Sequence, residues 1–376
     1  MSKLFEPLTL RGVTIRNRTM VAPMCMYEAK DGLANDFHLV HLGRYALGGW
    51  GLVMMEASAV EQRGRITHGD VGIWSDDHIE PLRRIASFLK AQGAVAGIQL
   101  GHAGRKASVQ RPYEGDGPLG SAQLAKGELP WEVVGPGTTP FDEGWITPHA
   151  LAVSELQDIK QSFCDAVLRA QAAGFDVIEL HAAHGYLLHS FLSPLTNKRE
   201  DKYGGDRDDR FRFPLEVAAA MRNLWPSDLP MFVRVSATDW VDGGIQVDDT
   251  VEFAKALREI GIDLMDCSTG GLTPRAQVPL SFGFQVPFAE SVKREANIPT
   301  SAVGLITDPQ LAEQIITEGK ADMIAVAREA LANPNWALNA LSALNEGGNS
   351  EFDGWPRAYK IWLAKRERAL QSIANA

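Results

Sequence analysis

Cysteine is scarce in this chain. The three cysteines, Cys25, Cys164 and Cys267, form an odd set without the paired spacing of a metal site. They favour a reducing compartment over a disulfide framework and exclude an iron–sulfur cluster held by cysteines. Basic runs are also absent: Lys and Arg number 37 against 47 Asp and Glu, for a net charge of −10. Neither nucleic acid nor an anionic membrane is therefore an expected partner.

Long hydrophobic runs are missing as well. No segment approaches the roughly 18 uninterrupted apolar residues of a membrane-spanning helix, and Glu6 interrupts the N-terminal segment before any apolar core of a signal peptide can form. We therefore expect a soluble, cytoplasmic protein.

A glycine-rich nucleotide-binding turn is lacking too. The first expected strand ends in Pro23-Met24-Cys25-Met26-Tyr27 rather than in G-x-G-x-x-G, which disfavours a doubly wound open sheet. Short apolar runs instead alternate with segments of helical period. The expected strands are 18–23, 51–56, 95–100, 177–180, 231–235, 264–266, 300–302 and 323–326, and the expected helices include 78–91, 154–173, 211–224, 247–260, 287–295 and 308–318. Eight such units predict an α/β fold, a single (β/α)8 TIM barrel.

Segment boundaries follow from capping residues. We expect helix starts at Ser154, at Asp248 or Asp249, and at Asp308, and helix ends at Gly174, Gly261 and Gly319. Residues 1–17 are expected to form a β-hairpin that caps the barrel floor, 18–333 the barrel, and 334–376 a helix and an extended C-terminal tail. The Gly- and Pro-rich stretch 105–148 is expected to fold over the mouth as loops.

The most informative motif is His181-Ala182-Ala183-His184-Gly185-Tyr186, which follows a buried strand. A bend after His181 would bring His184 beside it, so that two N–H groups face one oxygen while Tyr186 supplies a hydroxyl. Mutual satisfaction of three polar side chains at a strand end is an equally open interpretation.

Other strand ends add candidate groups. Cys25 is a nucleophile, a redox thiol or a core residue, and Gln99 has the donor and acceptor needed to bind the edge of a heteroaromatic ring or belongs to a capped network. Arg234 stands in an apolar run and needs an anion or several hydrogen-bond acceptors. Gly304 and Arg328 follow the seventh and eighth strands, where barrels commonly hold phosphate. Together they describe a plausible flavin mononucleotide (FMN) site below a substrate pocket.

Several strings occur in a characteristic order and spacing: Ala22-Pro23-Met24-Cys25-Met26-Tyr27, Gly64-Arg65-Ile66-Thr67, Gly72-Ile73-Trp74-Ser75-Asp76, Gln99 with His102 to Lys106, His181 to Tyr186, and Asn197-Lys198-Arg199 with Tyr203-Gly204-Gly205. In these strings the chain resembles the old yellow enzyme family, in particular its bacterial thermophilic-like ene-reductase branch. The resemblance implies an FMN enzyme that takes hydride from NAD(P)H and passes it to the β-carbon of an activated alkene by a ping-pong mechanism.

The resemblance also implies residue roles. Ala22, Pro23, Met24, Cys25, Ala57 and Gln99 would contact the flavin ring, with Cys25 tuning its potential, and Arg234 would stabilise the reduced ring. Gly304, Ala327 and Arg328 would lie at the phosphate, although relatives usually have glycine where Ala327 stands. His181 and His184 would bind the substrate carbonyl, Tyr186 would donate a proton, and Tyr27 and Trp362 would complete the pocket.

Partners and alternatives follow. The C-terminal tail with Trp362 would dock on a neighbouring subunit of a homodimer or homotetramer, or pack against its own barrel. Arg105 and Lys106 near the mouth would favour NADPH through its 2′-phosphate, although solvation at the surface explains them equally. No metal is expected, because neither His181 with His184 nor His38 with His41 has a clear carboxylate partner. A flavin-free lyase or aldolase on a phosphate-binding barrel and a non-catalytic flavin-binding protein remain the alternatives.

Overall fold

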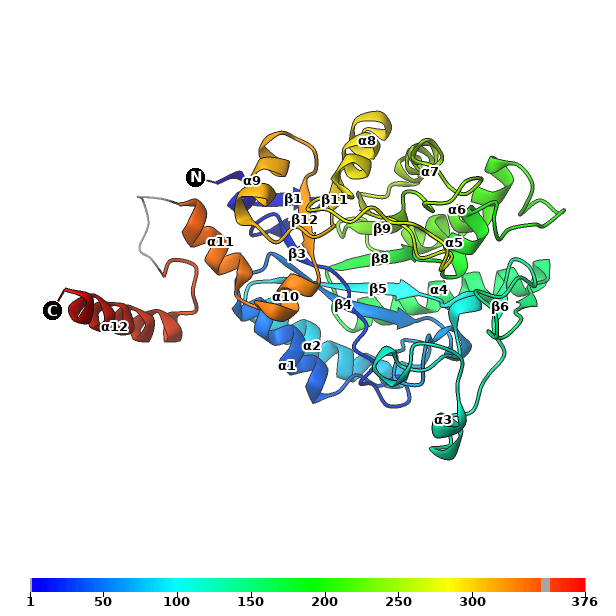
Figure 1. Ribbon diagram of the computed structural model, residues 1–376, viewed down its shortest axis with the longest axis horizontal. Helices are drawn as coiled ribbons and strands as arrows, with labels where there is room; N and C mark the ends of the chain where they lie inside the picture. Colours follow the sequence, from blue (N-terminus) through cyan, green and yellow to red (C-terminus); the bar gives the residue numbers. More distant parts are fainter. Residues whose placement is uncertain (1, 346–351, 376) are drawn as a thin grey trace.

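A closed barrel lies at the centre of the chain (Figure 1). The computed structural model describes residues 2–345 and 352–375. Within them, neighbouring strands of the barrel all pair in parallel, and the last strand pairs with the first. The strands are β3 (Thr19–Val21), β4 (Leu52–Ala59), β5 (Val95–Gly101), β8 (Val177–Ala182), β9 (Met231–Ser236), β10 (Leu264–Ser268), β11 (Thr300–Ala302) and β12 (Met323–Val326). The predicted fold and each of its eight expected strands are confirmed.

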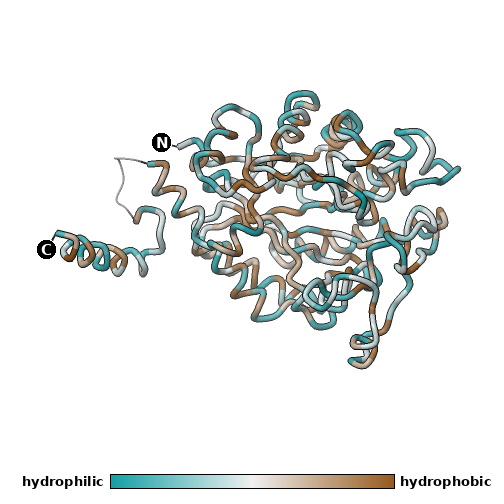
Figure 2. The backbone as a smooth tube through the Cα atoms, in the orientation of Figure 1, coloured by the Kyte–Doolittle hydropathy of each residue, from teal (hydrophilic) through white to brown (hydrophobic). Residues whose placement is uncertain are grey.

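Helices surround the strands. They are α1 (Asp36–Leu47), α2 (Ile79–Ala91), α4 (Val153–Ala172), α6 (Arg207–Leu224), α7 (Val247–Ile260), α8 (Val286–Ala296) and α9 (Pro309–Thr317), with the shorter α5 (Leu187–Leu192) and α10 (Arg328–Ala332) at the mouth. In Figure 2 the barrel strands are mostly hydrophobic, whereas the outer helices alternate between hydrophobic and hydrophilic turns. The six expected helices are all present, and α1 lies outside the expected set. Its Asn35 cap, whose side chain accepts a hydrogen bond from the Phe37 N–H, was the overlooked signal.

Helix starts were predicted with mixed success. Asp308 caps α9 as expected, accepting a hydrogen bond from the Leu311 N–H at 3.1 Å. Ser154 does not cap α4: the helix begins one residue earlier, and the Glu155 carboxylate accepts the Ala152 N–H at 2.7 Å. Likewise α7 begins after Gln246, whose N–H donates to Asp249 at 3.1 Å. An acidic residue in the first helical turn can thus bond back to the residue before the helix, which shifts the boundary.

Helix ends follow the expectation. Gly261 caps α7 with φ at +96°, a left-handed conformation that favours glycine. Gly174 and Gly319 lie one residue beyond the caps of α4 and α9, also with positive φ. Each glycine turns the chain from a helix toward the next strand.

The N-terminal hairpin closes the barrel floor, as predicted. Strands β1 (Leu8–Leu10) and β2 (Val13–Ile15) pair antiparallel, and Leu10 and Ile15 pack into the apolar interior of the barrel. Arg11 at the turn donates to the Asp263 carboxylate at 2.6 Å and to the carbonyl of Gly261 at 2.8 Å. Because these residues precede β10, the hairpin covers the amino ends of the strands and leaves the carboxyl ends as the open mouth.

The long segment after β5 lies at that mouth. It contains a short helix, α3 (Ser121–Ala125), and strand β6 (Val134–Gly135), which pairs with β7 (His149–Ala150). It is otherwise irregular, as expected for loops. Val109 and Val133 from this segment pack with Ile66 in a small apolar cluster against which Tyr27 and Tyr186 lie.

The C-terminal region begins with α11 (Trp336–Leu344), whose Trp336 stacks on Trp50 at a centroid distance of 5.4 Å. Residues 346–351 lie outside the described part of the chain. Helix α12 (Arg357–Ala374) buries none of its residues and lies in Figure 1 on the side of the barrel away from the carboxyl ends of the strands. Among the described residues, no helix is long and apolar enough to cross a membrane. The division at residues 17 and 333 stays a prediction.

Candidate active site

The turn after β8 brings the two histidines and the tyrosine together. His184 adopts a left-handed backbone, with φ at +59°, and Gly185 follows at +77°. As a result the His181 ring lies edge-to-face with the His184 ring at 5.3 Å and with the Tyr186 ring at 5.0 Å between centroids. This is the juxtaposition that the hexapeptide predicted.

Each histidine keeps one ring nitrogen free for a ligand. His181 Nδ1 accepts the Ala183 N–H at 3.3 Å, which places the ring hydrogen on Nε2. His184 Nε2 bonds to the Ser268 hydroxyl at 2.8 Å, and its backbone N–H donates to Ser236 at 2.9 Å. His181 Nε2 and His184 Nδ1 are therefore the nitrogens available to a substrate oxygen.

Burial keeps this cluster uncharged. It lowers the pKa of both His181 and His184 well below the usual range, and nearby Arg234 acts in the same direction. Burial also raises the pKa of the Tyr186 phenol. The histidines are accordingly neutral hydrogen-bond donors near pH 7, and the tyrosine retains a proton that it can give away.

A small pocket adjoins the cluster. Ala57, His181 and Tyr186 line it together with Ile66 and Ala103. Cys25 and Tyr27 pack against the same apolar residues, so the end of β3 meets the end of β8. Burial, with a further contribution from Glu56, raises the pKa of the Cys25 thiol. A thiol that keeps its proton is a poor nucleophile, so this shift disfavours the nucleophile interpretation of Cys25, whose role stays a prediction.

Inside the barrel, a polar layer lies beneath the mouth. Gln99 Nε2 donates to the Glu179 carboxylate at 2.7 Å, and Arg234 Nε lies 3.3 Å from the Asp266 carboxylate. The expectation that Arg234 needs an anion is confirmed. Burial raises the pKa of both Glu179 and Asp266, while Arg234 opposes this shift.

The two carboxylates were missed by the sequence reasoning. Glu179 and Asp266 each interrupt an apolar strand, the same signal that identified Arg234. Their register was the missing information: Asp266 pairs with Arg234 across β10 and β9, and Glu179 pairs with Gln99 across β8 and β5.

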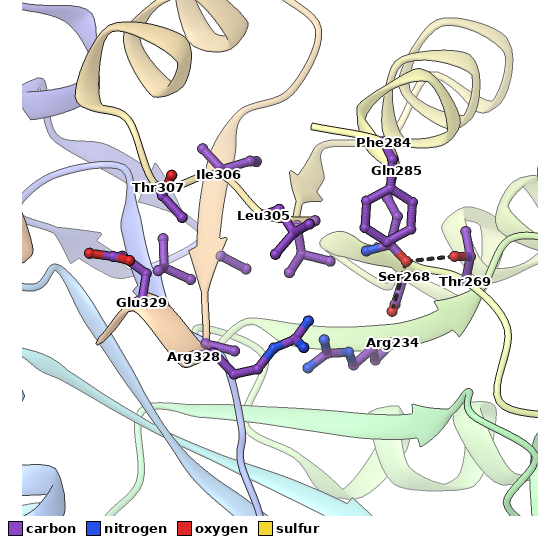
Figure 3. Close-up of a pocket in the computed structure, with 15 residues that line it drawn as sticks. Arg234, Ser268, Thr269, Phe284, Gln285, Leu305, Ile306, Thr307, Arg328 and Glu329 are labelled. Carbon is purple, nitrogen blue, oxygen red and sulfur yellow. Dashed lines mark hydrogen bonds between the residues drawn. The ribbon is translucent and has the colours of Figure 1, made fainter. Parts of the chain in front are cut away.

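A cavity of about 280 Å³ opens beside this layer, toward the ends of β11 and β12 (Figure 3). The residues that line it include the expected Arg234, Gly304, Ala327 and Arg328, together with Ser268, Thr269, Gln285 and Val303. Figure 3 shows the guanidinium groups of Arg234 and Arg328 directed toward the same part of the cavity. The Thr269 hydroxyl donates to the Gln285 amide oxygen at 2.6 Å.

The lining suits an anionic ligand. Arg328 is exposed and has no ion-pair partner among residues 2–345 and 352–375. Arg234 Nε faces the Asp266 carboxylate but makes no hydrogen bond within the protein, and Gly304 presents no side chain at the cavity wall. Ala327 has a negative φ of −112° and lines the cavity beside Arg328. The site thus has the cations that a phosphate ester needs.

The segment after β3 lies beside this cavity. The Ala22 N–H donates to the Val326 carbonyl at 2.9 Å, and Ala22 is buried while Pro23 and Met24 are half-buried. Ala22 and Ala327 pack against the same apolar cluster. The expected cofactor contacts from β3 and β12 therefore converge.

The surface-solvation interpretation of Arg105 and Lys106 is wrong, whereas their proposed contact with a 2′-phosphate stays a prediction. Arg105 is buried, and its guanidinium donates to the carbonyls of Leu272 at 2.6 Å and Pro140 at 2.9 Å. Lys106 donates to the carbonyls of His184 at 3.0 Å and Gly271 at 3.1 Å. Neither residue is therefore a solvated surface cation, and both donate to backbone carbonyls at the mouth.

Trp362 is not brought to the site within this chain. It is 67% exposed on α12, and Lys365 lies 4.5 Å from the centre of its ring. In Figure 1 α12 lies away from the mouth, so the role of Trp362 at a pocket of a neighbouring subunit stays a prediction.

His38 and His41, the second histidine pair considered as metal ligands, belong to no group of three or more potential ligands among the described residues. Buried His38 lies 3.7 Å from the Glu56 carboxylate, and burial lowers its pKa to about 4. Across the part of the chain that the structure describes, no group of three or more His, Cys, Asp or Glu side chains could hold a metal ion.

Three comparisons place this geometry among known proteins. The family model described as "NADH:flavin oxidoreductase / NADH oxidase family" matches residues 3–346. An NADPH dehydrogenase of Geobacillus sp. (strain WCH70) is 45% identical over 91% of this chain and 94% of its own length. An NADPH dehydrogenase of Bacillus subtilis (strain 168) is 44% identical over 91% of this chain and 95% of its own.

Solved structures share the fold. Morphinone reductase in complex with tetrahydroNAD superposes with a TM-score of 0.75 at 24% identity, covering 94% of this chain and 96% of the other. The old yellow enzyme homologue from Zymomonas mobilis gives 0.75 at 22% identity with the same coverage. A 2-naphthoyl-CoA reductase gives 0.81 at 24% identity, with 91% of this chain matching 52% of the larger one.

Proposed function

Since this chain belongs to the NADH:flavin oxidoreductase / NADH oxidase family, that of old yellow enzyme, we propose that it is an ene-reductase. Membership makes it an FMN-dependent enzyme that uses NAD(P)H as reductant and excludes the flavin-free lyase and the non-catalytic alternatives. The proposed substrates are α,β-unsaturated carbonyl or nitro compounds.

The residues at the mouth fit the cofactor. Ala22, Pro23, Met24, Cys25, Ala57 and Gln99 would contact the ring, Arg234 its polar edge, and Gly304, Ala327 and Arg328 the phosphate. The support is the cation pair at the cavity and the convergence of β3, β5, β9, β11 and β12 there. When bound, FMN supplies hydride transfer from NAD(P)H to the substrate.

Substrate activation is assigned to the histidine pair. His181 Nε2–H and His184 Nδ1–H would donate to the carbonyl oxygen of the substrate. Two such bonds draw electron density from the conjugated alkene and make its β-carbon electrophilic. The observation that carries this proposal is that one nitrogen of each ring is hydrogen-bonded within the protein, His181 Nδ1 to Ala183 and His184 Nε2 to Ser268. The other nitrogen of each ring is left for a ligand.

Tyr186 is the proposed acid. Its ring lies against His181, and burial keeps its phenol protonated near neutral pH. It would give its proton to the α-carbon of the substrate. Tyr27 would line the pocket from the opposite strand end, and Trp362 would approach from a neighbouring subunit of a homodimer or homotetramer.

One absorbance experiment tests the function. The purified protein should be yellow, should bleach anaerobically on addition of NADPH, and should regain colour when cyclohexenone is added. Bleaching without recovery on any activated alkene would reject the ene-reductase assignment while leaving the family intact.

Steady-state kinetics test the shared site. NAD(P)H and alkene would use one pocket in turn, so initial-rate lines at varied concentrations of both should be parallel. Intersecting lines would count against a single pocket. Replacing His184 with Ala should weaken alkene binding more than it slows bleaching by NADPH.

A further inference from the structure

Two loops at the mouth touch backbone to backbone. A Cβ added to Gly185 would lie 2.4 Å from the Gly271 carbonyl oxygen, and one added to Gly271 would lie 2.7 Å from His184 Cα. Both glycines and His184 have positive φ. Neither glycine has room for a side chain that could fix this contact. The position of the turn at 184–186 therefore depends on the groups that hydrogen-bond to its backbone.

The Lys106 ammonium spans this contact. Its Nζ donates to the His184 carbonyl at 3.0 Å and to the Gly271 carbonyl at 3.1 Å, one oxygen from each loop. It also lies over the Tyr186 ring at 5.1 Å and over the Phe141 ring at 4.5 Å. Two carbonyls and two ring faces surround the charge, and each is a favourable partner for a cation.

A second support acts on the same turn from below. His189 Nδ1 accepts the Gly185 N–H at 2.8 Å, and its Nε2 faces the buried Asp239 carboxylate at 3.0 Å. The Ser236 hydroxyl accepts the His184 N–H at 2.9 Å and donates to the Gly270 carbonyl at 2.8 Å, so it also joins the turn to the loop at 270–272. Lys106 adds the charged link between these two segments, through the His184 and Gly271 carbonyls.

We propose that Lys106 is a positioning residue that clamps the His184–Tyr186 turn against the loop at 270–272 and so sets the direction of His184 toward the substrate. It acts through His184 and Tyr186 and takes no part in the chemistry. The inference rests on the proposed function and adds to it a residue that determines substrate affinity.

The clamp depends on pH. Burial, followed by the neighbouring Arg105, lowers the pKa of Lys106 to about 8, while Asp116 opposes the shift. The ammonium is therefore charged below about pH 8 and neutral above it. His184 stays neutral and Tyr186 stays protonated through this range, because burial shifts their pKa values away from it. Affinity for a ligand held by His184 should fall as the pH rises through 8.

Binding of cyclohexenone to the oxidised holoenzyme tests the clamp, because no turnover occurs without NAD(P)H and the ligand does not ionise. Lys106→Met removes the charge and keeps the aliphatic stem; we expect affinity near pH 7 to fall at least about tenfold. The wild type should lose several-fold between about pH 7 and pH 9.5, whereas Lys106→Arg, which stays charged, should not. Burial also raises the pKa of Glu179. Because Glu179 is present in the wild type and in Lys106→Arg, its titration affects the affinity of both proteins equally and does not change their difference.

Lys90→Met is the matched control. Lys90 donates to the Gly174 carbonyl at 3.0 Å, just before β8, at the closed end of the barrel. It should leave cyclohexenone affinity and its pH dependence unchanged. Should Lys106→Met not fold, the comparison of the wild type with Lys106→Arg at high pH carries the test.

Hydrogen–deuterium exchange tests the clamp without substrate. The Gly185 amide should exchange about tenfold faster in Lys106→Met than in the wild type or in Lys90→Met. Unchanged exchange, or wild-type affinity in Lys106→Met at both pH values, would overturn the proposal. Faster exchange in a protein whose wild type binds no alkene would instead reject the proposed function and keep the clamp.

Discussion

Replacing Arg234 with Met is the sharpest perturbation of the barrel interior. Arg234 is 6% exposed, and Glu179 and Asp266, the two carboxyls that its charge stabilises, are fully buried. Removing the cation leaves Asp266 without its partner at 3.3 Å. Breaking a buried ion pair from one side costs about 3–5 kcal/mol, so the free energy of unfolding should fall by that amount.

The loss should depend on pH with a definite sign. Burial raises the pKa of both carboxyls in the folded protein, and the positive charge of Arg234 limits this increase. Without Arg234 the folded pKa values rise further, while the unfolded values stay near 4. A carboxyl with a raised folded pKa destabilises the fold increasingly as pH rises from the unfolded toward the folded value. The deficit of the variant should therefore be larger near pH 8 than near pH 5.

Urea unfolding followed by circular dichroism, with FMN in excess, measures this at both pH values. Adding Asp266→Asn to the variant removes one of the stranded carboxyls and should restore part of the stability. Wild-type stability of Arg234→Met near pH 8, or no gain from the second substitution, would refute the view that the guanidinium compensates these carboxyls.

Three further predictions follow. Tyr186→Phe should leave cyclohexenone binding and bleaching by NADPH intact but slow recovery of colour by about a hundredfold or more; an unchanged stopped-flow rate would show another proton source. Trp362→Ala should alter selectivity among alkenes of different size without releasing FMN, and identical kcat/KM ratios would remove Trp362 from the site. Asp308→Ala deletes the cap of α9 and should lower stability by about 1 kcal/mol in thermal melts, with activity preserved; an unaltered Tm would contradict the capping role.

Much of the fold could be predicted from the sequence because it depends on patterns among residues that are close together in the chain. Apolar runs alternate with segments of helical period, and each run became a strand of the barrel. The topology then placed Cys25, His181 and Arg328 at one mouth, since parallel strands end together. The pairing of His181 with His184 was also local, because it needs only a left-handed turn three residues long.

What the tertiary structure decided was the partner of each polar group. Glu179 meets Gln99, 80 residues away, through the register of β5 and β8, and Ser268 meets His184, 84 residues away. Lys106 reads in the sequence as a surface cation, yet folding places it over two carbonyls and two rings. Periodicity determines which residues become strands, because it acts between near neighbours. The hydrogen-bond partner of each buried polar side chain is determined only when the barrel closes. Closure brings residues that are distant in the sequence into contact and fixes the register of neighbouring strands.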